Sequence, residues 1–241
     1  MAVAQMTVGE IASHVPASLR VFERFHIDYC CNGSKSLLRA CRESGVAADE
    51  VLSEIEEART TEAEEEPTDW TEAPTSELID HIVRQHHWYT WAELPRLEQL
   101  LGKLLQSYHP EYPEALLLVS GVFRGLRGEL EQHMIKEQTQ LFPAIAEIEN
   151  AEKLGISVPQ PSLALVDRAI CGLLHEHELS GQALKEIRQV TREFHDSKSS
   201  RGAYLALLEE LQHFEEDLHI HIHLESNILF PRVRMIIAKA V

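Results

Sequence analysis

Apolar residues recur every three or four positions over most of the chain after residue 75, which is the period of an amphipathic α-helix. Four stretches follow this pattern, at about residues 76–107, 114–150, 161–195 and 202 to near the C-terminus. No stretch of any length alternates between apolar and polar residues, as a half-buried strand would. Long amphipathic helices joined by short connections favour an all-α fold, an up-down-up-down four-helix bundle.

The first 59 residues predict a small helical domain in front of this bundle. Thr7-Val-Gly-Glu10 has the capping-box pattern of a helix start, and Pro16 suits the first turn of a second short helix. Residues 60–74 are acidic and interrupted by proline, which is typical of an exposed linker. We therefore expect a helical domain at residues 1–59, a linker at 60–74 and the four-helix bundle at 75–241.

The apolar face of each long helix decides which polar side chains point into the bundle. In the first long helix the predicted inward positions are Ile79, Val83, His87, Thr90, Leu94, Leu97 and Leu101. In the other three helices the same face includes His133, Glu137, His177, His221 and Glu225. The neighbouring His86 and His175 fall to one side of this face. His219 and His223 lie well off it, and we expect both in solvent.

Two of the long helices carry the same motif, H-x-x-x-E-x-x-x-L-F-P, once from His133 to Pro143 and again from His221 to Pro231. A histidine and a glutamate four residues apart lie one above the other on the same helix face. Counted from the helix ends at about 1.5 Å per residue, the inward histidines and glutamates of all four helices lie roughly 17–24 Å along the bundle axis. We therefore expect four imidazoles and two carboxylates in one layer.

This layer predicts a metal site. A single inward histidine is more often a hydrogen-bonded core residue than a ligand. Two carboxylates buried together without a cation, however, would cost several kcal/mol each. Six donors exceed the needs of one tetrahedral zinc ion, and they suit two metals with two histidines each, bridged by Glu137 and Glu225 with room for an oxygen bridge. Iron is the first choice and manganese the second, with an open position for a small diatomic ligand.

Composition restricts the partners. The chain has 22 lysines and arginines against 39 aspartates and glutamates, a formal net charge of −17. Such a balance argues against nucleic acid and against anionic membrane surfaces. No apolar run approaches the roughly 18 residues of a membrane span, and no signal-peptide pattern opens the chain, so we expect a cytoplasmic protein.

The four cysteines are too few for a disulfide framework at this length. Cys30 and Cys31 are adjacent, follow Asp28 and precede the turn-forming pair Asn32-Gly33. We expect both thiols to be exposed on this turn, with a pKa raised by the neighbouring carboxylate. From the residues alone, two ordinary cytosolic thiols are the favoured interpretation.

The two L-F-P motifs, His87 and the pair Glu176-His177 together resemble a hemerythrin-like domain over about residues 75–235. The segment from Asp28 to Cys31, followed by Gly33, resembles the short cysteine-containing domain that precedes such a bundle in the repair-of-iron-centres family. There Asn32 stands where that family usually has glycine. The resemblance covers nearly the whole chain.

The resemblance implies a cytoplasmic stress protein that helps restore iron–sulfur clusters damaged by nitric oxide or peroxide, with damaged iron–sulfur proteins as partners. It implies a non-haem di-iron centre that reacts with NO or O2, held by the same six residues that the helix faces select. It also implies that Cys30 and Cys31 handle NO or iron, and that Glu129 and Glu176, at acidic positions near the centre, guide iron or protons.

Two other functions stay open at this point. One is oxygen binding of the hemerythrin type, which uses a fifth histidine; the other is sensing of NO, O2 or iron. Enzymatic reduction of NO is an open question, and a homodimer is compatible with the sequence although no motif demonstrates one.

Overall fold

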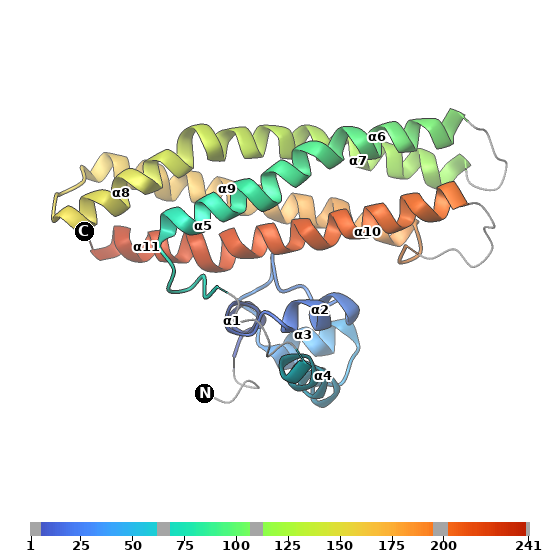
Figure 1. Cartoon of the computed structure of the whole chain (residues 1–241), viewed down its shortest axis with the longest axis horizontal. Helices are drawn as coiled ribbons and strands as arrows, with labels where there is room; N and C mark the ends of the chain where they lie inside the picture. Colours follow the sequence, from blue (N-terminus) through green and yellow to red (C-terminus); the bar gives the residue numbers. More distant parts are fainter. Residues whose placement is uncertain (1–5, 62–67, 107–112, 195–201, 240–241) are drawn as a thin grey trace. The chain divides into compact units, whose positions relative to one another are not determined.

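The computed structural model describes residues 6–61, 68–106, 113–194 and 202–239. Within these ranges the protein is built from helices and contains no strand, apart from an isolated bridge between Thr7 and Ser36 (Figure 1). The all-α prediction is therefore confirmed. The acidic run at 64–66 and the predicted helix breaks near 109–112 and 196–201 lie outside the described residues.

Four short helices form the N-terminal part: α1 (Val8–His14), α2 (Ser18–Arg24), α3 (Leu37–Ser44) and α4 (Ala48–Thr61). The predicted capping box is present, because the Glu10 backbone N–H donates to Thr7 Oγ1 at 3.2 Å and the Thr7 N–H donates to Glu10 Oε2 at 2.8 Å. Phe22 and Tyr29 are buried with their rings stacked at 5.8 Å. These short helices therefore have an apolar core of their own.

The four predicted long helices are all present, and three of them contain a π-helical segment. The first comprises α5 (Thr75–His81), η2 (Ile82–His87) and α6 (Trp88–Gln106), and the second α7 (Pro113–Lys136), η3 (Glu137–Leu141) and α8 (Phe142–Leu154). The third is α9 (Gln160–Val190), which is α-helical throughout. The fourth comprises α10 (Gly202–His223), η4 (Leu224–Leu229) and α11 (Phe230–Lys239).

By internal packing the described residues form two compact units. One comprises residues within 1–80, 146–163 and 219–241, and the other residues within 81–145 and 164–218. In the first, α1 packs against η4. In the second, α6 packs against α7, and the rings of Phe123 and Phe214 meet at 5.8 Å. Each boundary between the units falls inside a long helix.

The π segment η2 shifts the apolar face of its helix by one residue. Leu78 and Ile82 are fully buried, whereas Ile79 and Val83 are only half-buried. The prediction of Ile79 and Val83 as inward positions was therefore wrong. A π turn holds one residue more than an α turn, so the 3.6-residue period cannot be continued through it. After η2 the predicted face is correct again, from Thr90 to Leu101.

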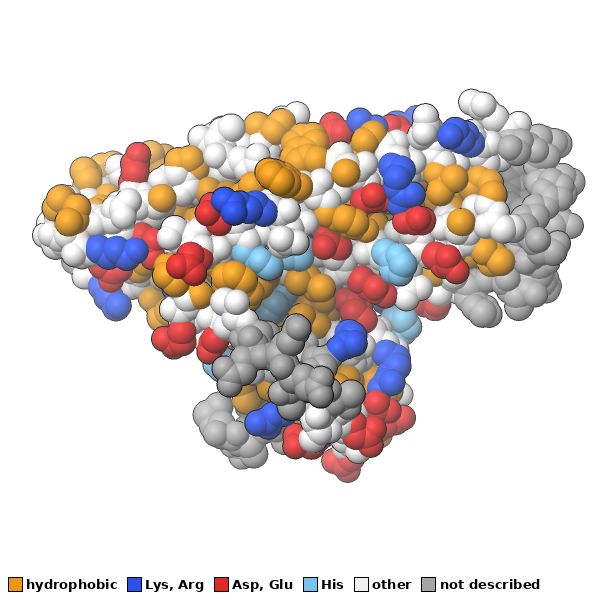
Figure 2. Space-filling model, in the orientation of Figure 1, with side chains coloured by type: hydrophobic (Ala, Val, Ile, Leu, Met, Phe, Trp, Pro, Cys, Tyr) orange, Lys and Arg blue, Asp and Glu red, His pale blue; other side chains and the backbone are white. Residues whose placement is uncertain are grey.

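Acidic and basic side chains are interspersed over the face seen in Figure 2, without a continuous basic patch. None of the described helices combines the length and the apolar character that a membrane crossing requires.

Candidate metal centre

All six side chains selected by the helix faces are buried, with 0–3% of each exposed. They come from six different elements, in chain order η2, α7, η3, α9, α10 and η4, and they are His87, His133, Glu137, His177, His221 and Glu225. His175, the neighbour that the helix face rejected, has 69% of its side chain exposed.

The π segments lie at the donors themselves. Their closing hydrogen bonds span five residues: the N–H of Trp88 donates to the Val83 carbonyl, that of Phe142 to Glu137, and that of Phe230 to Glu225. Pro143 and Pro231 lie two residues after the ends of η3 and η4 and have no N–H to continue an α-helical ladder. Single π turns inside α-helices are frequent at functional sites, and here each one contains or adjoins a buried donor.

Within the second unit, the Glu137 carboxylate lies between two imidazoles. Its Oε2 is 3.4 Å from Nε2 of His87, and its Oε1 is 3.2 Å from Nε2 of His133. The Nε2 atoms of His133 and His177 face each other at 3.0 Å. Within the first unit, Nε2 of His221 lies 3.1 Å from Oε1 of Glu225.

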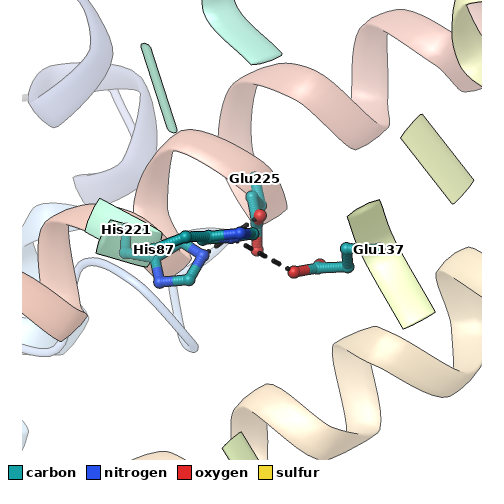
Figure 3. Close-up of side chains that lie close together, drawn as sticks. All are labelled: His87, Glu137, His221 and Glu225. Atoms are coloured by element: carbon teal, nitrogen blue, oxygen red, sulfur yellow. Dashed lines mark ion pairs between the residues drawn. The ribbon is translucent and has the colours of Figure 1, made fainter. Parts of the chain in front are cut away.

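The donor atoms fall into two groups of four, each lying within 4.8 Å of one another. One group is His87, Glu137, His221 and Glu225, which Figure 3 shows converging, and the other is His133, Glu137, His177 and Glu225. Both glutamates belong to both groups, and each group has its own pair of histidines.

The chemistry of these donors fits metal ions. Donors bound to one metal at about 2.1 Å lie about 3.0 Å apart at a right angle and about 3.4 Å apart at the tetrahedral angle. The four measured separations, 3.0 to 3.4 Å, fall in this range. Neither oxygen of the fully buried Glu137 accepts a hydrogen bond within the described part of the chain. A carboxylate in that state needs a cation.

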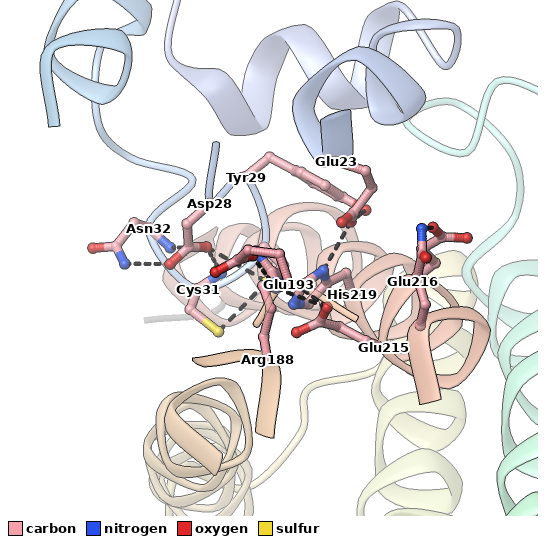
Figure 4. A network of polar contacts seen from close by, with 12 residues as sticks. Glu23, Asp28, Tyr29, Cys31, Asn32, Arg188, Glu193, Glu215, Glu216 and His219 are labelled. Atoms are coloured by element: carbon pink, nitrogen blue, oxygen red, sulfur yellow. Dashed lines mark hydrogen bonds and ion pairs between the residues drawn. The ribbon is translucent and has the colours of Figure 1, made fainter. Parts of the chain in front are cut away.

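Another buried carboxylate, that of Glu215, has an arginine as its partner and needs no metal ion. Glu215 in α10 is 2% exposed, and its Oε2 accepts hydrogen bonds from Nε and a terminal nitrogen of Arg188, at 2.9 and 2.8 Å (Figure 4). The guanidinium supplies both the charge and the donors. Glu137 has imidazoles in that place, and neutral imidazole nitrogens are metal ligands.

Glu176 orients one of the histidines. Its Oε2 lies 2.9 Å from Nδ1 of His133, and its Oε1 accepts a hydrogen bond from Nζ of Lys136 at 2.5 Å. The hydrogen bond with His133 and the one from Lys136 lower the pKa of the Glu176 carboxyl to about 2. An ionised Glu176 accepts the Nδ1 proton of His133 and so directs the Nε2 lone pair toward the donor groups.

Gln138 is the corresponding neighbour of His87, with its amide nitrogen 2.8 Å from Nδ1. The helix-face argument missed this residue, because Gln138 directly follows the inward Glu137 and lies to one side of the seam. Its signal in the sequence is its adjacency to a predicted ligand within η3. The other predicted acidic residue, Glu129, is exposed on α7.

Two histidines outside the donor groups, His219 and His223, correct the sequence-based expectations. His223 is 2% exposed, and burial lowers its pKa to about 4. The side chain of His219 is 14% exposed and its Nδ1 lies 2.8 Å from Oε1 of Glu23. Both were expected in solvent, and that was wrong because the N-terminal part, through Tyr29 and Glu23, packs on this face of the helix. His86 is buried beside Asp217, with Nδ1 2.9 Å from Oδ1.

The cysteine loop is also more enclosed than expected. Cys30 is 3% exposed and Cys31 half-buried, so the expectation of two exposed thiols was wrong. Asn227 of η4 causes this enclosure, because its amide nitrogen donates to the carbonyls of Tyr29 and Cys30 at 3.2 and 3.0 Å. Cβ atoms on Gly9 or Gly33 would lie 2.7 or 2.1 Å from Oδ1 of the same asparagine, so the approach requires glycine.

A third donor group lies in this loop: Asp28, Cys30 and Cys31. Figure 4 shows Asp28 and Cys31. The Asp28 carboxylate already accepts hydrogen bonds from the backbone N–H groups of Cys31 and Asn32 at 2.9 and 3.2 Å. Burial raises the Asp28 pKa, but the hydrogen bonds from Asn32, Cys31 and Cys30 bring it below its ordinary value. The hydrogen bond from Cys30 to Cys31, burial and the nearby carboxylates raise the Cys30 pKa well above its ordinary value, so this thiol is protonated at neutral pH.

Comparison with known proteins agrees with the geometry. Residues 78–233 match the family described as hemerythrin HHE cation binding domain, and residues 4–59 match a domain of unknown function, DUF542. A probable iron–sulfur cluster repair protein of Haemophilus influenzae is 30% identical over 233 residues, which are 97% of this chain and 98% of the relative. The iron–sulfur cluster repair protein YtfE of Dickeya chrysanthemi is 30% identical over 226 residues, 94% of this chain and 95% of the relative. The protein of the same name from Escherichia coli is 30% identical over 235 residues, 96% of this chain and 98% of the relative.

Proposed function

The chain belongs to the hemerythrin HHE cation-binding family, and from this premise we propose that it is a di-iron protein that repairs iron–sulfur clusters damaged by nitrosative or oxidative stress. The observation that carries the proposal is the pair of four-donor groups that share Glu137 and Glu225. Relatives that match nearly the whole chain are named for cluster repair. The matches of residues 4–59 and 78–233 to two different families also support a chain of two parts.

In this proposal His87 and His221 would hold one iron and His133 and His177 the other, and Glu137 and Glu225, which belong to both donor groups, would be ligands shared by the two metals. When bound, the metals would supply a site for NO or O2 and a source of iron. The chain's own residues would bind the metals through Nε2 and carboxylate oxygens, and the buried ring of Phe142, which stacks on that of His87 at 5.8 Å, helps to exclude water. Glu176 holds the proton on Nδ1 of His133.

Oxygen carriage of the hemerythrin type is the less favoured alternative. It would use a fifth histidine ligand, and neither donor group contains one. His86 and His223 are buried outside the donor groups. The ring of His86 contacts Asp217 and His81, and that of His223 contacts Tyr29 and Asn227.

The accessory residues have narrower proposed roles. Cys30 and Cys31 handle NO or iron at the loop held by Asn227, and Glu129, exposed one turn before His133, meets iron or protons at the surface. The clients are damaged iron–sulfur proteins in the cytoplasm. A homodimer is compatible with this function but is not required by it.

The test begins with iron content. Purified protein, loaded with iron(II) without air, should bind two irons per chain and restore an NO-damaged [4Fe–4S] hydratase. His133→Ala and Glu225→Ala should lose both properties, whereas His175→Ala, an exposed histidine on α9, should keep them. Rapid NO consumption without transfer of iron to the hydratase would assign NO reduction in place of iron donation. A protein that binds two irons but repairs no cluster, or one that forms a stable reversible O2 adduct, would overturn the repair proposal.

A further inference from the structure

The two histidines next to Glu137 have different partners on their outer nitrogens. Nδ1 of His133 faces the Glu176 carboxylate at 2.9 Å, and Nδ1 of His87 faces the Gln138 amide at 2.8 Å. Both rings present Nε2 to Glu137, at 3.2 and 3.4 Å. The two metal positions therefore share a bridging carboxylate but differ in what stands behind a histidine ligand.

A carboxylate and an amide act differently on an imidazole. A carboxylate that accepts the Nδ1–H proton places negative charge behind the ring, which raises the basicity of Nε2 and its strength as a ligand. A neutral amide oxygen fixes the ring orientation without adding charge. The Gln138 amide can turn its oxygen toward Nδ1 by rotating about its last bond, as metal binding at Nε2 requires, because Nδ1 then carries the proton.

Lys136 reduces the difference in charge between the Glu176 carboxylate and the Gln138 amide. Its ammonium group lies 2.5 Å from the second oxygen of Glu176 and offsets part of the carboxylate charge. The Lys136 side chain in α7 is 48% exposed and that of Glu176 in α9 is 33% exposed, so a substitution of either residue changes a partly exposed side chain and not the core. The chain thus offers three residues that change the charge behind a ligand without removing the ligand.

We propose that Glu176 and Gln138 make the two metal positions inequivalent: the iron held by His133 and His177 is bound more tightly and is more easily oxidised, and the iron held by His87 and His221 is the one released first. This inference rests on the proposed di-iron centre. Glu176 and Gln138 are positioning residues, since each acts through a histidine and touches no metal. In a repair protein such a difference would let one iron leave while the other stays.

The experiment uses the full chain loaded with ⁵⁷Fe(II) without air, Glu176→Gln and Gln138→Glu, and two measurements. Stepwise removal of iron by a graded chelator gives two affinities, and Mössbauer spectra give one quadrupole doublet for each iron. Wild-type protein should show two separated affinities and two doublets. Glu176→Gln should weaken the tighter site about 10- to 100-fold, the usual effect of losing a carboxylate behind a histidine ligand, and should shift only one doublet.

The reverse change should affect the other iron. Gln138→Glu should tighten the weaker site and shift the second doublet, and the double variant should restore two unequal sites with their order exchanged. Lys136→Met keeps the Glu176–His133 hydrogen bond and removes the neutralising charge, so it should move the same doublet as Glu176→Gln in the opposite direction. Circular dichroism and thermal unfolding of each metal-free variant check that the fold is kept.

The outcomes separate the two proposals. A wild-type chain that binds no iron pair would overturn the di-iron centre itself. Two irons with equal affinity and one shared doublet, or a Glu176→Gln variant that changes both irons alike, would overturn the inequivalence and leave the di-iron centre standing. Different shifts in the two single variants would support the inference even if every variant kept its repair activity.

Discussion

The donor layer and the cysteine loop both bring carboxylates together with nitrogen or sulfur donors, yet their carboxylates are in opposite states. Glu137 is fully buried, lies between two imidazoles and accepts no hydrogen bond from the described residues. Asp28, in contrast, accepts hydrogen bonds from two backbone N–H groups and from the Asn32 amide. The same functional group therefore lacks hydrogen-bond donors in one region, as a metal ligand would, and caps a turn in the other.

Donor atoms that lie close together do not by themselves indicate a metal site. Asp28 obtains its stabilisation from the backbone, so the cysteine loop keeps its shape without a cation. Glu137 has no such donors, and burying an ionised carboxylate without compensation costs several kcal/mol. A cation is needed where the protein supplies no hydrogen bonds, and four predictions test that distinction.

The largest expected effect concerns metal content. Glu137→Ala removes a ligand shared by both donor groups and should reduce bound iron from two per chain to none. Asp28→Ala should leave two irons bound and lower the free energy of unfolding by about 1–2 kcal/mol, as the loss of a capping side chain does. Elemental analysis and denaturant unfolding measure the two effects. Loss of iron in Asp28→Ala would contradict the separation of the regions.

The second prediction uses metal-free protein. Glu137→Met should raise the free energy of unfolding by about 1–3 kcal/mol, because a buried carboxylate without hydrogen bonds is replaced by an apolar side chain of similar length. Glu215→Met should lower it by about 3–5 kcal/mol, because Arg188 then loses its buried partner. Urea unfolding after removal of iron measures both. Destabilisation by Glu137→Met would mean that the carboxylate is satisfied without metal.

The third prediction tests the packing of the cysteine loop. Gly33→Ala would place a Cβ 2.1 Å from Oδ1 of Asn227, whose amide nitrogen holds two carbonyls of the loop. We expect a loss of about 1–3 kcal/mol and a faster reaction of Cys30 with a thiol reagent. Gly102→Ala is the control, because nothing lies within 4 Å of its Cβ and it should stabilise α6 by up to about 1 kcal/mol. Unchanged thiol reactivity in Gly33→Ala would show that the contact does not enclose Cys30.

The smallest effect is a dependence on pH. The folded-state pKa of Asp28 lies below its ordinary value, so its hydrogen bonds stabilise the protein above that ordinary value, near 4, and the contribution is lost as pH falls through the folded-state pKa. The stability difference between wild type and Asp28→Asn, measured on metal-free protein, should therefore shrink between about pH 5 and pH 3. A constant difference over that range would exclude the ionised carboxylate as the acceptor.

Helix periodicity predicts some parts of this fold well and fails at identifiable points. In α9 the apolar residues on the face of His177 are all buried, because the helix is α-helical throughout: Leu163, Val166, Ile170, Leu173, Leu184 and Ile187. In the first long helix the prediction fails before η2 and succeeds after it. A π turn leaves no clear signal in the hydrophobic pattern, since it is formed where packing and buried donors compensate for its weaker geometry.

Helix periodicity also could not predict which residues are buried on the outer side of a helix. His223 and His219 lie off the inward face, and they are covered because Tyr29 and Glu23 of the N-terminal part pack against them. Cys30 is buried for a related reason, through Asn227. These contacts join residues almost 200 positions apart in the chain, and no local pattern specifies which outer surface a second group of helices will cover.

The sequence by itself determined the helices, their inward faces outside the π turns and the residues that reach the donor layer, because the 3.6-residue period and the four-residue spacing of His and Glu are local properties. Tertiary structure decided the rest: the π turns that carry the donors, the glutamate and the glutamine that stand behind two histidines, and the enclosure of the cysteines. Each of these depends on which distant side chain supplies a hydrogen bond or excludes water, and that is fixed only when the helices pack.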